Sequence, residues 1–279
     1  MRVGPGTNIL LTGARGGLGT PMTLALARAG ANLALVAYPG VDLDDLRSQV
    51  EKLGIKAIAI RFDLAQRERL PELLAQVKAE LGPVDVLINN AGVEFTSAYH
   101  ELEVERIRET ILVNLEAPLI LSRLLLPEML ARKRGHIVNI SSLAGLAKPA
   151  FQESYAATKA GLISFTGALR ATYRPQGVSA SVIIPGFVEA GIYARLKTTA
   201  GRSAPALLGT CSPERVASAV LRALERDLPE VCVSKFPVRP LLALSVLSPR
   251  LGAWITDITG VNAFFGQAVE AVKTGRKSA

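Results

Sequence analysis

A serine, a tyrosine and a lysine in the middle of the chain have the types and spacing of a proton-transfer site. Tyr155 and Lys159 are four residues apart, so on a helix they share one face, and Ser142 lies thirteen residues upstream. A free phenol has a pKa near ~10, and a neighbouring ammonium group favours the phenolate and lowers that pKa. We therefore expect Tyr155 to donate and accept a proton, with Ser142 as a hydroxyl partner. The alternative is a surface pair that contributes only ~0.2–0.5 kcal/mol to a helix.

The second chemical feature is a glycine-rich segment near the N-terminus, with the sequence TGARGGLG at 12–19. It follows an apolar run at 9–11 and precedes a helical pattern at 18–29, which is the strand–turn–helix context of a dinucleotide site. Glycines allow a tight turn and a close approach of the backbone to a pyrophosphate. The helix N-terminus offers free N–H groups and the positive end of its dipole to the phosphates. The segment therefore predicts a dinucleotide cofactor.

These two motifs, with several others in the same order, resemble those of the short-chain dehydrogenase/reductase family. The other matching residues are Asp63, Asn89, Asn90, Ala91, Gly92, Asn114, Pro185 and Gly186. The resemblance covers residues 7–190 closely and the remainder loosely. It implies an NAD(P)-dependent oxidoreductase whose partner is a small-molecule carbonyl or alcohol.

The resemblance also implies roles for the catalytic residues, which are Asn114, Ser142, Tyr155 and Lys159. Ser142 would hydrogen-bond the substrate carbonyl, and Lys159 would hold the nicotinamide ribose while lowering the pKa of Tyr155. Asn114 would bend its helix and hold a water leading to the lysine. The expected cofactor-binding residues are Gly13, Arg15, Gly17, Leu18, Gly19, Tyr38, Asp63, Leu64, Asn90, Ala91, Gly92, Tyr155, Lys159, Pro185, Gly186 and Val188.

The expected reaction reduces a ketone or aldehyde, with Tyr155 as the acid, or runs in reverse with tyrosinate as the base. The alternative is a dinucleotide-binding regulatory or structural protein with little turnover, because fold alone does not decide function. The complete set of Ser142, Tyr155 and Lys159 favours the enzyme.

The segment after the second expected strand favours NADP over NAD. An acid here usually binds the 2′-hydroxyl of NAD, but the chain has Tyr38, and Asp42 lies further on, where it is expected to cap the next helix. Arg15 would pair with a 2′-phosphate; the alternative is a solvated loop arginine. The family often has a threonine that bonds the nicotinamide carboxamide at the position of Ala190, and the alanine of this chain has no hydroxyl for that bond.

The elements that hold these residues alternate between strands and helices. Short apolar runs predict strands at 8–12, 32–37, 56–61, 84–88, 136–141, 178–184 and 230–233. Helical patterns lie at 18–29, 42–53, 66–81, 103–133, 152–173 and 213–226. The alternation predicts a single α/β domain over 1–279, a Rossmann-type, doubly wound parallel sheet with helices on both faces.

Composition agrees with this class of protein. The chain has 279 residues, 49% of them hydrophobic and 20% charged, which suits one domain with a sizeable core. No run approaches the ~18 apolar residues of a spanning helix, and the first strand begins too early for a signal peptide, so a cytoplasmic protein is expected. The two cysteines and two histidines match no disulfide framework and no metal site, and we expect no metal.

The net charge of +8 raises the question of an anionic partner. Basic residues are interleaved with acids, and the densest run, at 132–134, falls at the end of an expected helix, where cations suit the helix dipole. No nucleic-acid motif accompanies it, so we expect no nucleic-acid partner.

Residues 235–279 form an apolar C-terminal extension. The run LLALSVL at 241–247 is too short to span a bilayer and must be buried or form a contact site. We expect residues 236–266 to give the substrate pocket an apolar wall and to favour a hydrophobic substrate. The alternatives are a subunit contact and a peripheral membrane contact. The basic residues that would help the membrane contact are Arg239, Arg250, Lys273, Arg276 and Lys277.

Small residues on the helix expected at 152–173 allow another element to approach closely. They are Ala156, Ala157, Ala160, Gly161, Gly167 and Ala168. The family resemblance implies a homo-dimer or homo-tetramer formed through this helix and the one at 103–133.

Overall fold

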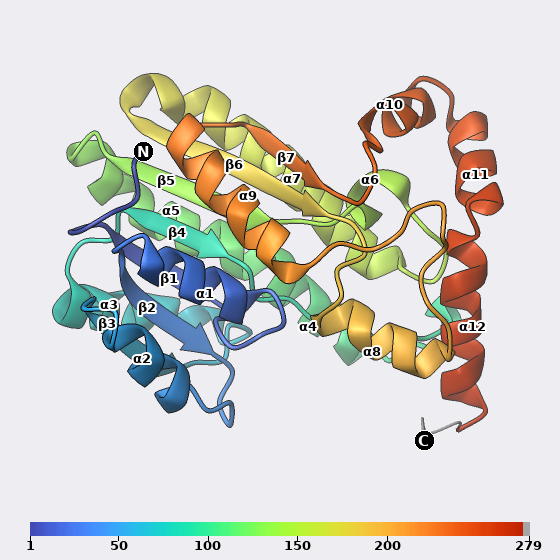
Figure 1. Cartoon of the computed structure of the whole chain (residues 1–279), viewed down its shortest axis with the longest axis horizontal. Coiled ribbons are helices and arrows are strands. Elements are labelled where there is room, and N and C mark those ends of the chain that lie inside the picture. The colour runs from blue at the N-terminus through green and yellow to red at the C-terminus, as the bar shows by residue number, and fades with distance from the viewer. Residues whose placement is uncertain (276–279) are drawn as a thin grey trace.

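A parallel sheet of seven strands forms the centre of the computed structural model, which describes residues 1–275 (Figure 1). The strand order β3-β2-β1-β4-β5-β6-β7 reverses between β1 and β4, where a sheet of this kind has a crevice at the carboxyl ends of its strands. The strands are β1 (Asn8–Thr12), β2 (Asn32–Ala37), β3 (Ala57–Arg61), β4 (Val86–Asn89), β5 (Gly135–Ile140), β6 (Val178–Pro185) and β7 (Glu230–Val233). The predicted doubly wound sheet is confirmed, and every strand lies within two residues of its expected bounds.

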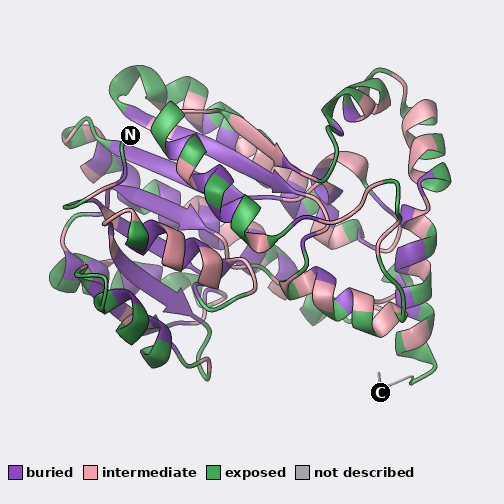
Figure 2. Cartoon of the chain, viewed as in Figure 1, coloured by how far each residue is buried: buried purple, intermediate pink, exposed green. Residues whose placement is uncertain are grey.

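Helices cover both faces of the sheet and bury it in two separate cores. One core contains α1 (Gly19–Arg28), α2 (Asp44–Glu51) and α9 (Pro213–Arg226). The other contains α3 (Leu70–Leu81), α5 (Ala117–Ala131) and α7 (Glu153–Tyr173). Because both faces are covered, the strands are mostly apolar, and every residue of β4 and β5 is buried (Figure 2).

The basic run that follows α5 has a structural partner. Asp85 lies just before β4 with its carboxylate buried, and it accepts hydrogen bonds from Arg132 at 2.7 Å and Arg134 at 3.0 Å. Two of the three cations are thus paired with a buried carboxylate next to the sheet, in addition to lying at the end of a helix.

The helix expected at 103–133 consists of three segments. A π-helical segment, Leu112–Glu116, separates α4 (Val104–Ile111) from α5, and Asn114 lies buried within it. Among the described residues, this stretch is the one helix whose length and composition would suit a membrane span. Its α5 part instead packs on the sheet, where Leu121, Leu125 and Met129 belong to a core.

The C-terminal extension is helical. After β7 the chain forms α10 (Arg239–Leu247), α11 (Pro249–Ile258) and α12 (Val261–Lys273). Phe264 and Phe265 of α12 form a third core with α8 (Gly191–Ala200), a helix that the sequence pattern did not predict. Figure 1 shows α10 and α11 standing away from the sheet. Arg276 and Lys277 lie outside the described residues.

Candidate active site

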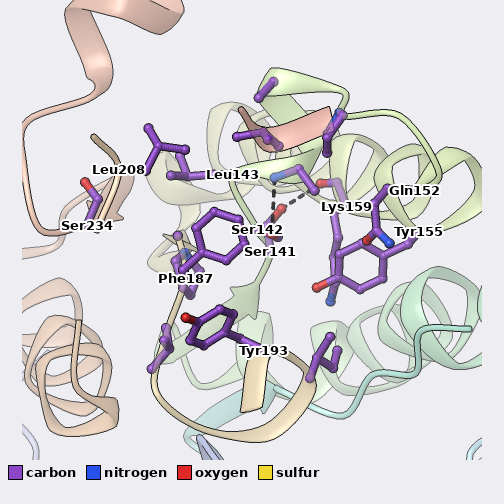
Figure 3. A pocket seen from close by; sticks show the side chains of 18 of the residues that line it. Ser141, Ser142, Leu143, Gln152, Tyr155, Lys159, Phe187, Tyr193, Leu208 and Ser234 are labelled. Carbon is purple, nitrogen blue, oxygen red and sulfur yellow. Dashed lines mark hydrogen bonds between the residues drawn. The ribbon is translucent and has the colours of Figure 1, made fainter. Parts of the chain in front are cut away.

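A cavity of about 460 Å³ lies at the carboxyl ends of β1, β4, β5 and β6 (Figure 3). Its walls come from the glycine-rich turn, from the segments after the strands, from α7 and α8, and from the C-terminal extension. The predicted site residues that line it are Gly13, Gly17, Leu18, Asn90, Ala91, Gly92, Ser142, Tyr155, Lys159, Pro185, Gly186 and Val188. The predicted residues that do not line it are Arg15, Gly19, Tyr38, Asp63, Leu64 and Asn114.

The serine, tyrosine and lysine lie together on one wall. Ser142 follows β5, and Tyr155 and Lys159 occupy adjacent turns of α7, as their spacing predicts. The Lys159 ammonium lies 5.5 Å from the centre of the Tyr155 ring and donates a hydrogen bond of 3.0 Å to the Ile140 carbonyl. Figure 3 shows Tyr155 and Lys159 side by side, across the cavity from Phe187 and Tyr193.

Burial dominates the proton affinities of this pair. It raises the pKa of Tyr155 to about 12, while the hydrogen bond with Ser142 acts in the opposite direction. It lowers the pKa of Lys159 to about 8, since the buried ammonium loses its water. The expectation of a lowered pKa for Tyr155 is therefore wrong in direction. Sequence spacing places the ammonium near the phenol, but it does not reveal how far both groups are removed from water.

Asn114 joins the π-helical segment to the loop after β4. Its side chain accepts a hydrogen bond from the Val93 N–H at 2.8 Å and donates one to the Val93 carbonyl at 2.9 Å. A Cβ atom at Gly92 would lie 3.3 Å from the Asn114 oxygen and 3.4 Å from the Lys159 ammonium. The asparagine thus sits close to the lysine without a large side chain between them. Its role in holding a water stays a prediction.

The Asn90 side chain braces the glycine-rich turn. It donates hydrogen bonds of 3.0 Å to the carbonyls of Thr12 and Gly13. The Thr12 hydroxyl in turn accepts the N–H groups of Asn90 and Ala91. These bonds fix the end of β1 against the end of β4, so the polar residues after β4 shape the turn.

Three glycines in the turn have no room for a side chain. Gly13 has a φ of +65°, and a Cβ atom there would approach the Ala91 Cα to 2.8 Å. A Cβ atom at Gly17 would overlap the backbone of Gly191, and one at Gly19 would overlap the Gly13 carbonyl. The turn therefore leads tightly into α1, whose first turn carries no acidic residue. A bare backbone at a helix N-terminus, open to the cavity, fits the pyrophosphate of a dinucleotide.

The region expected to take the adenosine end lies beyond the cavity. Tyr38 follows β2 and is 63% exposed. Arg15 extends from the glycine-rich turn toward Asp45, with 3.8 Å between guanidinium and carboxylate. The Asp63 carboxylate accepts the N–H of Ala65 and so turns the chain after β3. No charged side chain follows directly after β2, where the chain continues with Tyr38, Pro39 and Gly40.

Three further residues belong to this region. The Asp42 carboxylate accepts the N–H of Asp44 at 2.9 Å, but the N-cap of α2 is Leu43, so the expected N-cap at Asp42 is wrong by one residue. Arg61, at the end of β3, was not predicted; it lies 3.0 Å from Asp44 and 3.5 Å from Asp42. Leu64 is buried in the core, so only its backbone is available to a ligand.

Three polar residues near Tyr155 were not predicted from the sequence. Glu94, in the loop after β4, is buried and lies 2.6 Å from Arg195 of α8. Gln152, just before α7, donates a hydrogen bond of 3.0 Å to the same carboxylate. The available signal was weak, because Glu94 and Arg195 are a hundred residues apart and no pattern joins them.

Within residues 1–275, no group of three or more His, Cys, Asp or Glu side chains could hold a metal ion. Cys211 and Cys232 are both free. The polar side chains that line the cavity carry hydroxyl, amide, ammonium and guanidinium groups.

Comparisons with known proteins agree on one family. Residues 7–201 match the model of the short chain dehydrogenase family. The chain is 38% identical over 267 residues to ketoacyl reductase HetN of Nostoc sp., covering 94% of this chain and 90% of that protein. Among solved structures, the chain is similar to a protein from Beutenbergia cavernae that is named as an NAD(P) dependent gluconate 5-dehydrogenase and has NADP bound at low occupancy. The TM-score is 0.72 and the sequence identity is 27%, and the match covers 83% of this chain and 96% of that one. A metagenomic short-chain oxidoreductase in complex with NADP has a TM-score of 0.70 and 30% identity over 83% of this chain and 98% of its own.

Proposed function

The chain belongs to the short-chain dehydrogenase/reductase family and is an NAD(P)-dependent oxidoreductase, and we propose that it interconverts a hydrophobic carbonyl compound and its alcohol with Tyr155 as general acid and base. The observation that carries this proposal is the shared cavity wall of Ser142, Tyr155 and Lys159, directly beside the glycine-rich turn. The relative named as a ketoacyl reductase supports carbonyl reduction as the working direction.

The roles of the residues follow from their places on this wall. Bound NAD(P)H supplies the hydride for reduction. Ser142 hydrogen-bonds the carbonyl oxygen, and Tyr155 gives its proton to that oxygen as negative charge builds up there. Lys159 holds the nicotinamide ribose. Burial lowers the pKa of its ammonium to about 8, so the ammonium releases its proton more readily close to the phenol. Asn114, held by its bonds to Val93, is proposed to hold a water that leads to Lys159.

The other proposed cofactor contacts lie between the glycine-rich turn and the end of β6. We propose that residues 1–279 act as one domain, because elements from the turn to α12 line one cavity.

The experiment that tests the function is a panel of aldehydes and ketones with NADPH and NADH in parallel. Turnover of carbonyl compounds supports the enzyme, whereas cofactor binding without turnover on any of them would favour a regulatory dinucleotide-binding protein.

The cofactor preference is proposed to be NADP, with Arg15 as the residue that selects it. Replacing Arg15 with alanine is expected to weaken NADPH binding roughly tenfold, since a charged hydrogen bond to a phosphate contributes about 1.5–3 kcal/mol, and to leave NADH binding nearly unchanged. Fluorescence titration with both cofactors measures this. Arg28→Ala, at an exposed site in the last turn of α1, is the matched control. Tighter binding of NADH than NADPH by the parent protein would overturn the preference.

The C-terminal extension supports a hydrophobic substrate. The inner sides of α10 and α11 line the cavity, and the residues involved are Leu241, Leu242, Ser245, Gly252, Ile255 and Thr256. The outer sides carry exposed apolar residues, among them Leu244, Leu247, Trp254 and Ile258. The extension thus gives the cavity an apolar wall, and its outer side remains available for a subunit or membrane contact.

Substitutions of two leucines on α10 distinguish a role of the extension as a pocket wall from a role in a subunit or membrane contact. Leu242 lines the cavity and is 9% exposed, whereas Leu247 is 82% exposed. Leu242→Ala is expected to raise KM for long apolar carbonyls about tenfold, with a much smaller effect on small ones, because a lost apolar contact is worth about 1–3 kcal/mol. Leu247→Ala is expected to leave both unchanged. Equal effects of the two substitutions on long and small substrates would contradict the pocket wall. A smaller oligomer, or lost vesicle binding, in Leu247→Ala would assign the outer side to a subunit or a membrane.

A homo-dimer or homo-tetramer through α7 and the α4–α5 helix also stays a proposal. A Cβ atom at Gly167 of α7 would meet no atom within 4 Å, so this part of the helix is open to a neighbour. Light scattering that shows a monomer at micromolar concentration would contradict it.

A further inference from the structure

Glu94 is an anion buried beside the proposed proton donor. Its side chain is only 1% exposed. The carboxylate accepts hydrogen bonds from the Thr96 hydroxyl at 3.1 Å, from Gln152 at 3.0 Å and from Arg195 at 2.6 Å. A buried carboxylate is costly unless it is paired in this way, so the loop after β4 holds this charge at a fixed place.

Arg195 brings the opposite charge from another part of the fold. It lies on α8, donates to both the carbonyl and the carboxylate of Glu94, and lines the main cavity. Its side chain is 55% exposed. The pair therefore ties α8 to the loop after β4 at the edge of the cavity.

Both charges act on Tyr155. Glu94, Gln152 and Tyr155 line a second cavity of about 10 Å³, next to the main one. The field of the Glu94 carboxylate raises the pKa of Tyr155 and that of the Arg195 guanidinium lowers it, both more weakly than burial. Two further charged groups lie on α7 itself, where Lys159 is buried and Glu153 is exposed.

We propose that Glu94 and Arg195 are positioning residues for Tyr155, which hold α8 over the cavity and set the electrostatic potential at the phenol with opposite signs. This inference rests on the proposed role of Tyr155 in proton transfer. Because Glu94 is buried while Arg195 is half in solvent, the carboxylate is less screened and exerts the larger effect.

The two partners of one ion pair should therefore shift the reaction in opposite directions. In the pH profile of kcat/KM for alcohol oxidation, the acidic limb reports the base form of Tyr155. Glu94→Gln removes the anion and should move this limb to lower pH, whereas Arg195→Gln should move it to higher pH. We expect shifts of about 0.5–1 pH unit, smaller than those of a charge in direct contact. Loss of a merely structural contact would change stability or KM in both variants alike and would not produce opposite shifts.

A neighbouring ion pair provides the control. Lys197 also lies on α8 and pairs with Glu189 at 3.3 Å, and neither residue lines a cavity with Tyr155. Lys197→Gln removes a cation from the same helix and should leave the limb in place. Thermal unfolding of each variant shows whether α8 remains folded.

A second measurement needs no turnover. Ultraviolet absorbance follows ionisation of the phenol in the cofactor-free protein, and each variant is compared with the same variant carrying Tyr155→Phe. Opposite shifts of this titration in Glu94→Gln and Arg195→Gln support the inference, whether or not a carbonyl substrate is turned over. A lack of turnover on every carbonyl substrate would overturn the proposed function instead. Shifts in the same direction, or none, in an active and folded enzyme would overturn the inference alone.

Discussion

Replacing Tyr155 with phenylalanine is expected to lower turnover by about 10²–10⁴-fold, the usual contribution of a positioned acid–base group. The substitution removes one hydroxyl and keeps the ring that packs beside Lys159. Binding of the cofactor should stay close to that of the parent, because the glycine-rich turn is untouched. Turnover on the best substrate, together with cofactor titration and thermal unfolding, measures these effects.

Tyr99→Phe provides the matched control, since Tyr99 is exposed and lies outside both cavities. It loses the same hydroxyl and should keep parental turnover. A Tyr155→Phe enzyme within about threefold of the parent would end the assignment of Tyr155, because loss of a group acting in the transition state must lower kcat.

The strands and the doubly wound parallel sheet were accessible from sequence because they depend on local patterns. Runs such as Val86–Asn89 are short and apolar wherever helices cover both faces, and the alternation with helices restricts the connections to right-handed crossovers. The glycine-rich turn was equally visible, since its glycines are required by the backbone contacts of Gly17 and Gly19. For these features the structure follows directly from the hydrophobic periodicity and from the residue types.

The electrostatics of the site were not accessible in this way. The spacing of Tyr155 and Lys159 places both on α7, but the direction of the tyrosine pKa depends on how completely water is excluded. The Glu94–Arg195 pair forms only when α8 folds across the loop after β4. Such contacts join distant segments, and no local pattern predicts them.

The structure of the C-terminal extension was predictable from the sequence only in part. Its apolar character predicted burial, and Phe264 and Phe265 do form a core with α8. Pro240 and Pro249 lie in the first turns of α10 and α11, where a missing N–H costs little. The extension is therefore a helical wall.

The glycine-rich turn leads to the second large expected effect. Gly19→Ala places a Cβ atom into the Gly13 carbonyl and within 2.8 Å of the Ala14 carbonyl oxygen. Neither carbonyl can move freely, because Asn90 holds the Gly13 oxygen at 3.0 Å and Thr23 holds the Ala14 oxygen at 3.4 Å. Relief of the overlap must therefore shift the start of α1 away from β1.

We expect Gly19→Ala to lower the free energy of unfolding by about 1–3 kcal/mol or more, as overpacking of a tight site does, and to weaken cofactor binding. Urea unfolding and cofactor titration measure the two effects. Gly4→Ala makes the same chemical change where the nearest atom to the new Cβ is 3.9 Å away, so it should match the parent in both measurements. If Gly19→Ala also matched the parent, the turn would have to be adaptable. The close packing of the glycine backbone could then not be what shapes the cofactor site.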